Sequence, residues 1–359
     1  MKRIFTLIIS TLLITGGIIN AQETVRINAI KANNFGLTYT LPKTSLVFNF
    51  TIKKTTKTKG DFYPYAKQYL GIENPITENE VIYTLENVEA YNKGIPDKTN
   101  SFLVEFKSNS LEPYVFLTKD NLICAINATP EIELVSLKNA ATKSEPLVNA
   151  QRFFSQEVLI AGSTAKQAEL VARQILDLRR SRTDILTGEA DNMPPDGEAY
   201  KVVMEQINIQ EKALTEMFSG TTQTETFTQE FTFVPDEKNV ERAVVARFSE
   251  KLGLVDVDDL AGEPIYLTLT NKTPPVAVVL TEKEQKKMDE KFATGLVYNI
   301  PGKAQLIMEY KHQPIITKEF DIVQFGTKDV LVKKMFDNMK MPIKILFYTE
   351  LGAIKQIIQ

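Results

Sequence analysis

Apolar and polar residues alternate along much of the first part of the chain, a period of two that is typical of strands. In 46–52, Leu46, Phe48, Phe50 and Ile52 share one face, and polar residues or Val47 occupy the other. Further strands are predicted between glycine, proline and Asp-Asn turns, over 81–91, 101–106, 114–118 and 122–127. A short helix is predicted over 61–71, with Pro64 in its first turn and Gly71 at its end.

The middle of the chain changes to a helical period. Apolar residues recur every three or four positions over 163–182, which places them on one helical face. They are Ala168, Val171, Ala172, Ile175 and Leu178. The segment 198–218 repeats this pattern and Gly220 ends it. Two helices joined by such a loop most simply form an antiparallel hairpin.

After 220 the period returns to two, with threonines on one face and Phe227, Phe231 and Phe233 on the other. A helix is predicted over 240–251, because Val244, Val245 and Phe248 are spaced for one helical face. Strands are predicted over 265–269, 276–280, 303–310, 314–320 and 343–348, with His312 in a turn.

These patterns predict an α+β fold with two mostly antiparallel β regions and short helices, the regions being separated by an antiparallel helical hairpin. The expected division is a signal peptide over 1–21, an N-terminal β-rich domain over 22–155, the hairpin over 156–220 and a C-terminal β-rich domain over 221–359. The sequence leaves open whether the two β regions pack as one body.

The first residues have the order of charge and polarity that is typical of a secretory signal. Lys2 and Arg3 precede an apolar run over 4–19, and Ala21 is small enough for cleavage. An uncleaved N-terminal anchor is the alternative interpretation. No cysteine lies near the cleavage position, so a lipoprotein is not expected. We therefore expect an exported protein, periplasmic or associated with the cell envelope, with no transmembrane segment in the mature chain.

Composition narrows the function classes. The chain has 359 residues, 43% of them hydrophobic and 24% charged, which is ordinary for a globular protein. Its formal net charge of -3 gives no reason to expect a nucleic-acid partner. The single cysteine, Cys124, lies in an apolar run and is interpreted as a core thiol.

Candidate chemistry is sparse. With one histidine and one cysteine far apart, the chain cannot assemble a usual zinc site. A Ser-His-Asp mechanism needs a histidine near the nucleophile, and the single histidine, His312, falls in a predicted turn and is interpreted as a surface residue. Ser163 and Lys166 match the Ser-x-x-Lys pattern of penicillin-binding enzymes, but no partner motif accompanies them. Ser163 is better interpreted as a helix cap. We therefore assign no catalytic residue, metal ligand or cofactor.

The basic residues Arg179, Arg180 and Arg182 are the candidate partner-binding residues. They could bind an anionic glycan or a phosphate. The alternative is a solvated helix face with ion pairs to the second helix, which carries Glu205, Glu211 and Glu216.

Four segments together resemble a family. They are Tyr39-Thr40-Leu41-Pro42-Lys43-Thr44, 65–72, 182–189 and Gly253-Leu254-Val255-Asp256. With the N-terminal signal, they are similar to an uncharacterised exported family of Gram-negative, gut-type bacteria, a domain of unknown function. The resemblance implies an envelope location, and that Arg182, Asp184 and Glu189 hold the hairpin to the β domains.

Three functions remain open. The favoured hypothesis is a non-enzymatic envelope protein that contacts a partner protein or a glycan through the hairpin. The alternative is a carboxylate-based glycan hydrolase, which would need two acidic side chains about 5 to 9.5 Å apart in one cleft. A transport or lipid-carrying role would need a large apolar cavity.

Overall fold

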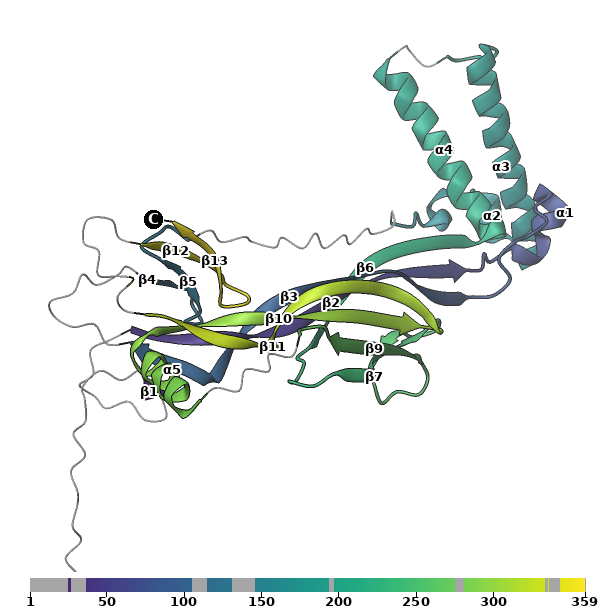
Figure 1. Ribbon diagram of the computed structural model, residues 1–359. Helices are drawn as coiled ribbons and strands as arrows, with labels where there is room; N and C mark the ends of the chain where they lie inside the picture. Colours follow the sequence, from purple (N-terminus) through teal and green to yellow (C-terminus); the bar gives the residue numbers. More distant parts are fainter. Residues whose placement is uncertain are drawn as a thin grey trace, which may run out of the picture.

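Two very long paired strands, β2 and β3, run through the body of the protein in the computed structural model (Figure 1). The structure describes residues 25–26, 37–104, 115–130, 146–193, 197–274, 281–332, 335 and 343–358. The predicted signal peptide over 1–21 and the predicted strand over 276–280 lie outside these residues. Within them the strands pair into three antiparallel sheets.

The first sheet has the order β1-β3-β2-β6, with bounds Val25–Arg26, Glu80–Val104, Leu37–Thr58 and Thr221–Phe233. The second has the order β11-β10-β9-β7-β8, with bounds Gln313–Leu331, Leu296–Tyr310, Glu263–Asn271, Val240–Ser249 and Gly253–Val255. The third has the order β13-β12-β5-β4, with bounds Ala353–Ile358, Lys344–Tyr348, Ile123–Ile126 and Val115–Leu117.

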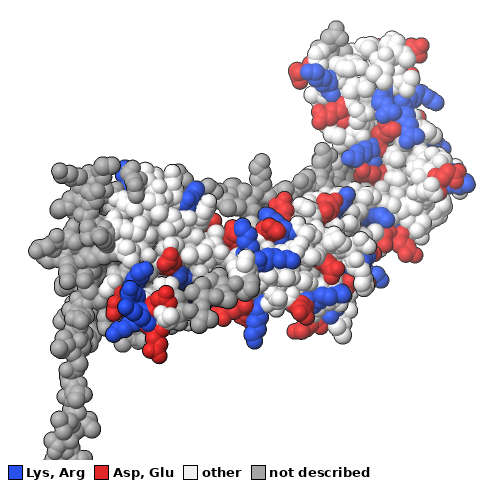
Figure 2. Space-filling view, viewed as in Figure 1, with Lys and Arg blue, Asp and Glu red and all other residues white. Residues whose placement is uncertain are grey.

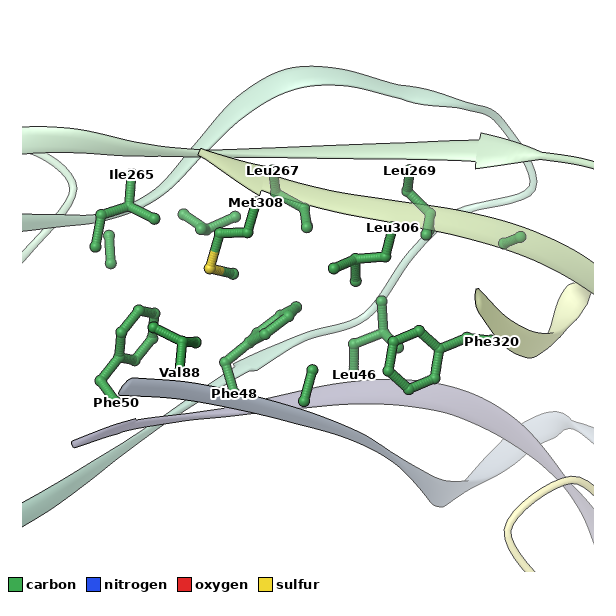
Figure 3. Packing of buried hydrophobic residues seen from close by; sticks show 14 of the residues in the cluster. Leu46, Phe48, Phe50, Val88, Ile265, Leu267, Leu269, Leu306, Met308 and Phe320 are labelled. Atoms are coloured by element: carbon green, nitrogen blue, oxygen red, sulfur yellow. The ribbon is translucent and has the colours of Figure 1, made fainter. Parts of the chain in front are cut away.

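The largest core lies between the first and second sheets. Figure 3 shows Leu46, Phe48 and Phe50 of β2 pointing toward side chains of the second sheet. The facing residues include Ile265, Leu267 and Leu269 of β9, Leu306 and Met308 of β10, and Phe320 of β11. The alternation in 46–52 is therefore confirmed as the buried face of a strand, because a period of two places alternate side chains on one side of a sheet.

The long strands bend between this core and a second one. Pro42 of β2 lies opposite Pro96 of β3, and the register shifts between Thr40 and Pro42. A proline cannot donate to the ladder, so such positions occur at edges and bulges. Beyond the shift, Tyr39 packs in a second core with strands of the third sheet and one end of β10 and β11. Its hydroxyl accepts from the Val297 amide at 2.8 Å.

The interpretation of Cys124 as a buried thiol is confirmed. Cys124 lies in β5 and is 5% exposed. Burial raises the pKa of this thiol above its ordinary value. A neutral buried thiol is a poor nucleophile, because the thiolate is the reactive form.

The helices gather mainly at one end of the body, where α3 and α4 stand away from the sheets (Figure 1). The short elements beneath them are η1 Tyr63–Tyr65, α1 Ala66–Leu70, η2 Ala150–Phe153 and α2 Gln156–Ile160. The long helices are α3 Thr164–Thr187 and α4 Glu198–Ser219. The helix α5, Glu282–Thr294, lies at the other end of the body.

The two β regions pack as one body, which the sequence had left open. Strand β6, from the C-terminal region, pairs with β2 from Leu46–Phe233 to Thr58–Thr221. Strand β12 likewise pairs with β5, and the largest core joins strands of both regions. The residue boundaries of the predicted domains stay a prediction, whereas the mixed fold with antiparallel sheets is confirmed.

The predicted helix over 240–251 is wrong, because Val240–Ser249 forms strand β7. This strand pairs with β9 through two register shifts, between Val240 and Ala243 and between Val244 and Ala246. Each bulge adds a residue and interrupts the period of two. The apolar spacing therefore resembled a helix.

The pairing of β10 with β11 shifts register at Gly326, between the pairs Ile300–Thr327 and Gly302–Ile322. A Cβ at this position would lie 1.9 Å from the Ile300 carbonyl oxygen, so the backbone could not stay in place. We predict that Gly326→Ala lowers the free energy of unfolding by about 1 to 3 kcal/mol, measured by urea denaturation. Gly162→Ala is the control, because nothing lies within 4 Å of its Cβ. Equal stabilities for the two variants would contradict the proposed tight packing.

Candidate functional site

The helices α3 and α4 form the most prominent projection of the protein (Figure 1). Ser163 caps α3, because its side chain accepts from the Lys166 amide at 3.3 Å. The Lys166 ammonium donates to Glu169 at 3.0 Å. The cap interpretation of Ser163 is therefore confirmed. Gly188 ends α3 in the left-handed conformation, with φ of 78°.

The lower half of this projection is anchored in a third core. Its buried members on α3 are Ala168, Val171, Ala172 and Ile175, and those on α4 are Leu214, Met217 and Phe218. They pack with Phe62 and Ala66 beneath the helices. The helical face that the sequence predicted over 163–182 is therefore confirmed as a buried face.

The upper half is built differently. No residue over 176–187 of α3 or over 198–212 of α4 is buried. Figure 1 shows the two helices close together beside α2 and farther apart toward the loop that joins them. The upper halves therefore rely on the anchored lower halves for support, because short helices without packing are marginal in water. We call the residues 176–187 and 198–212 the distal segment.

An ionic cluster links the two helices at the bottom of the distal segment. The Arg179 Nε donates to Glu211 Oε1 at 2.7 Å. The Arg182 guanidinium donates to the other oxygen of the same carboxylate and to Asn208 Oδ1. The Glu211 side chain is only 13% exposed, so solvent screens these pairs less than it screens surface pairs.

A hollow of about 310 Å³ lies beside this cluster. Its lining residues are Arg179, Arg182, Asn208, Glu211, Lys212, Thr215 and Glu216. Burial raises the pKa of Glu216 above its ordinary value, and the nearby Lys212 charge opposes that shift. The Thr215 hydroxyl is buried, with no hydrogen-bond partner among the described residues. The hollow is therefore polar and holds both signs of charge.

The structure separates the three candidate arginines. Arg179 and Arg182 meet at Glu211, so the predicted ion pairing with the second helix is confirmed for them. Arg180 is exposed, lies outside the hollow and makes no ion pair within the described part of the chain. The role of the three residues in binding a partner stays a prediction.

The expectation that Arg182, Asp184 and Glu189 hold the hairpin to the β domains is wrong. Arg182 bonds to α4, as described above. The Asp184 carbonyl accepts from the Glu189 amide at 2.8 Å, which closes the end of α3. The segment 182–189 is the far end of α3, and Figure 1 shows that this end of the helix stands away from the sheets.

Four large apolar residues of the distal segment are exposed, namely Leu176, Leu186, Val202 and Val203. The sequence pattern had placed Val203 on the apolar face of the second helix, whereas Leu186 was missed. Leu186 lies eleven residues after Ile175, and Val203 lies eleven residues before Leu214. Eleven residues are about three helical turns, so each shares the face of a residue buried in the third core. Yet Leu186 is 62% exposed and Val203 is 37% exposed. These faces stay open because the helices diverge.

The hollow does not contain the two free carboxylates that the glycan hydrolase hypothesis requires. The two carboxylates of the hollow are Glu211 and Glu216, and both oxygens of Glu211 are bonded to arginines. A glycan hydrolase needs a carboxylate that is free to attack or to activate water. Across the described ranges, no three His, Cys, Asp or Glu side chains are grouped to hold a metal ion. None of the described helices is long and apolar enough to cross a membrane.

Charges elsewhere do not mark a second site. Figure 2 shows basic and acidic side chains next to one another over the body and the projection, with no extended area of one sign on this face. The ion pairs along β2, such as Lys54 with Glu225, follow this mixed pattern.

Fold and site together define a protein of antiparallel sheets that carries a projecting pair of helices. The chain belongs to the family described as Domain of unknown function (DUF4831), whose model matches residues 35–355. No curated protein and no solved structure matches the chain significantly.

The link between the two helices depends on one carboxylate, so Glu211 can be tested directly. We predict that Glu211→Gln lowers the free energy of unfolding by about 1 kcal/mol. Glu205→Gln is the matched control on the same helix, because Glu205 is exposed and has no ion pair among the described residues. It should change stability by less than about 0.5 kcal/mol. Equal effects in urea denaturation would contradict the structural role of Glu211.

Proposed function

We propose that this is an exported, non-enzymatic binding protein that holds a partner protein on the distal segment of its helical hairpin. The observation that carries the proposal is the helical face that continues from the third core into solvent. Leu186 and Val203 extend the buried faces of α3 and α4, yet they stay exposed. Exposed apolar surfaces that continue beyond the core of a protein typically mark interaction sites.

A protein partner fits this surface better than a glycan does. The distal segment is long, open and lined by aliphatic side chains, and Tyr200 is its single aromatic residue. Apolar helical faces commonly bind another helix through residues spaced by three or four positions. Sugar rings instead stack on aromatic side chains, which this surface offers only once.

The cellular location is part of the proposal. The charge order of Lys2 and Arg3, the apolar run over 4–19 and the small residue Ala21 support a cleaved signal. Export would place the protein in the envelope, where a projecting helical surface can contact another envelope protein.

The proposal can be tested with a double variant, Leu186→Glu with Val203→Glu. Binding would bury two carboxylates without partners, which costs free energy and weakens the contact. Crosslinking to a partner in cells that produce the protein should therefore fall by about tenfold or more. Leu260→Glu is the control, because Leu260 is 82% exposed but lies between β8 and β9. Unchanged crosslinking in the double variant, or the same loss in the control, would contradict the proposal.

A further inference from the structure

The hollow at the bottom of the distal segment has an excess of positive charge. Three cations line it, Arg179, Arg182 and Lys212, and two carboxylates, Glu211 and Glu216. Three positive and two negative charges leave one positive charge. Because burial raises the pKa of Glu216, protonation of this group would increase the excess.

The arginines also retain hydrogen-bond donors. A guanidinium carries five N–H donors. Arg179 uses its Nε toward Glu211, and Arg182 uses its Nη1 toward Glu211 and Asn208. The remaining nitrogens of both groups have no hydrogen bond to a described residue, and both side chains are more than one third exposed. Glu211 therefore orients the two guanidinium groups without occupying them fully.

Apolar side chains lie directly beyond the charged hollow. Leu186 follows Arg182 by one helical turn, and Val203 precedes Glu211 by about two turns. A partner segment lying between the diverging helices would thus contact the cations of the hollow at one end, and Leu186 and Val203 farther along the helices. An acidic group flanked by apolar ones is complementary to both.

We propose that the partner presents an amphipathic helix with an Asp or Glu among its apolar residues, and that this carboxylate pairs with Arg179, Arg182 and Lys212. The inference rests on the proposed function, because it names the chemistry of the partner helix that the distal segment binds. Arginine and carboxylate form strong, directional charge-assisted pairs. The apolar residues of the partner helix pack on Leu186 and Val203.

A photo-activatable amino acid in place of Val203 tests the inference in the full-length protein, in cells that produce it. Lys212→Gln removes one cation of the hollow, and Lys286→Gln removes an exposed cation of α5, at the other end of the body. We expect the yield of the crosslinked product to fall about fivefold or more with Lys212→Gln and to change less than about twofold with Lys286→Gln. Mass spectrometry of the product then identifies the attached segment.

The outcomes separate the inference from the proposed function. An attached segment of another protein, with an acidic residue within one helical turn and apolar residues at helical spacing, supports the inference. A segment without a carboxylate, a crosslink between two copies of this chain, or equal effects of the two variants overturns it. If Val203 gives no crosslink to any protein, the proposed function fails as well.

Discussion

The pairing of β2 with β3 is the constraint on which the rest of the structure depends. These strands carry Leu46, Phe48 and Phe50 into the largest core and Tyr39 into the second. The bend at Pro42 and Pro96 lets one pair of strands serve both cores. At their other end the same strands lead to α1, whose Ala66 supports the helices of the third core. The hairpin is therefore held by the rigid end of a sheet.

This support explains how an unburied surface can persist. The lower parts of α3 and α4 pack on Phe62 and Ala66, and Glu211 then ties the helices together just above. Beyond that point the helices diverge, and no residue of the distal segment is fully buried. The result is a stable base that presents a polar hollow, with exposed apolar side chains farther along the helices.

Local patterns predicted much of the fold. The alternation over 46–52 and the helical face over 163–182 were correct, because burial on one side imposes a period on the sequence. Strand β7 was missed because two bulges interrupt its period. Helix α5 was also missed, because it buries no residue. The sequence signal for α5 was the capping box of Thr281 and Glu284, which stabilises a helix start through hydrogen bonds. A capping box does not produce a periodic apolar pattern, so a search for such patterns did not find it.

The site was only partly predictable. The arginines stood out by composition, but their partner could not be chosen among three glutamates without the register of the two helices. Leu186 and Val203 follow a pattern that normally predicts burial, so only the divergence of the helices reveals them as exposed. The pairing of β6 with β2 in one sheet was likewise not predictable, because it joins segments that are far apart in the sequence. A local pattern of apolar residues does not specify which strands pair.

Hydrogen exchange of the isolated protein tests the central claim most directly, namely that the hairpin has an anchored base and an unsupported distal segment. Amides near Ile175 and Leu214 should exchange about 100-fold more slowly than those of 180–187 and 198–205, because only the former lie in a packed core. Uniformly slow exchange along both helices would contradict the account, since the distal segment would then need no partner to cover it.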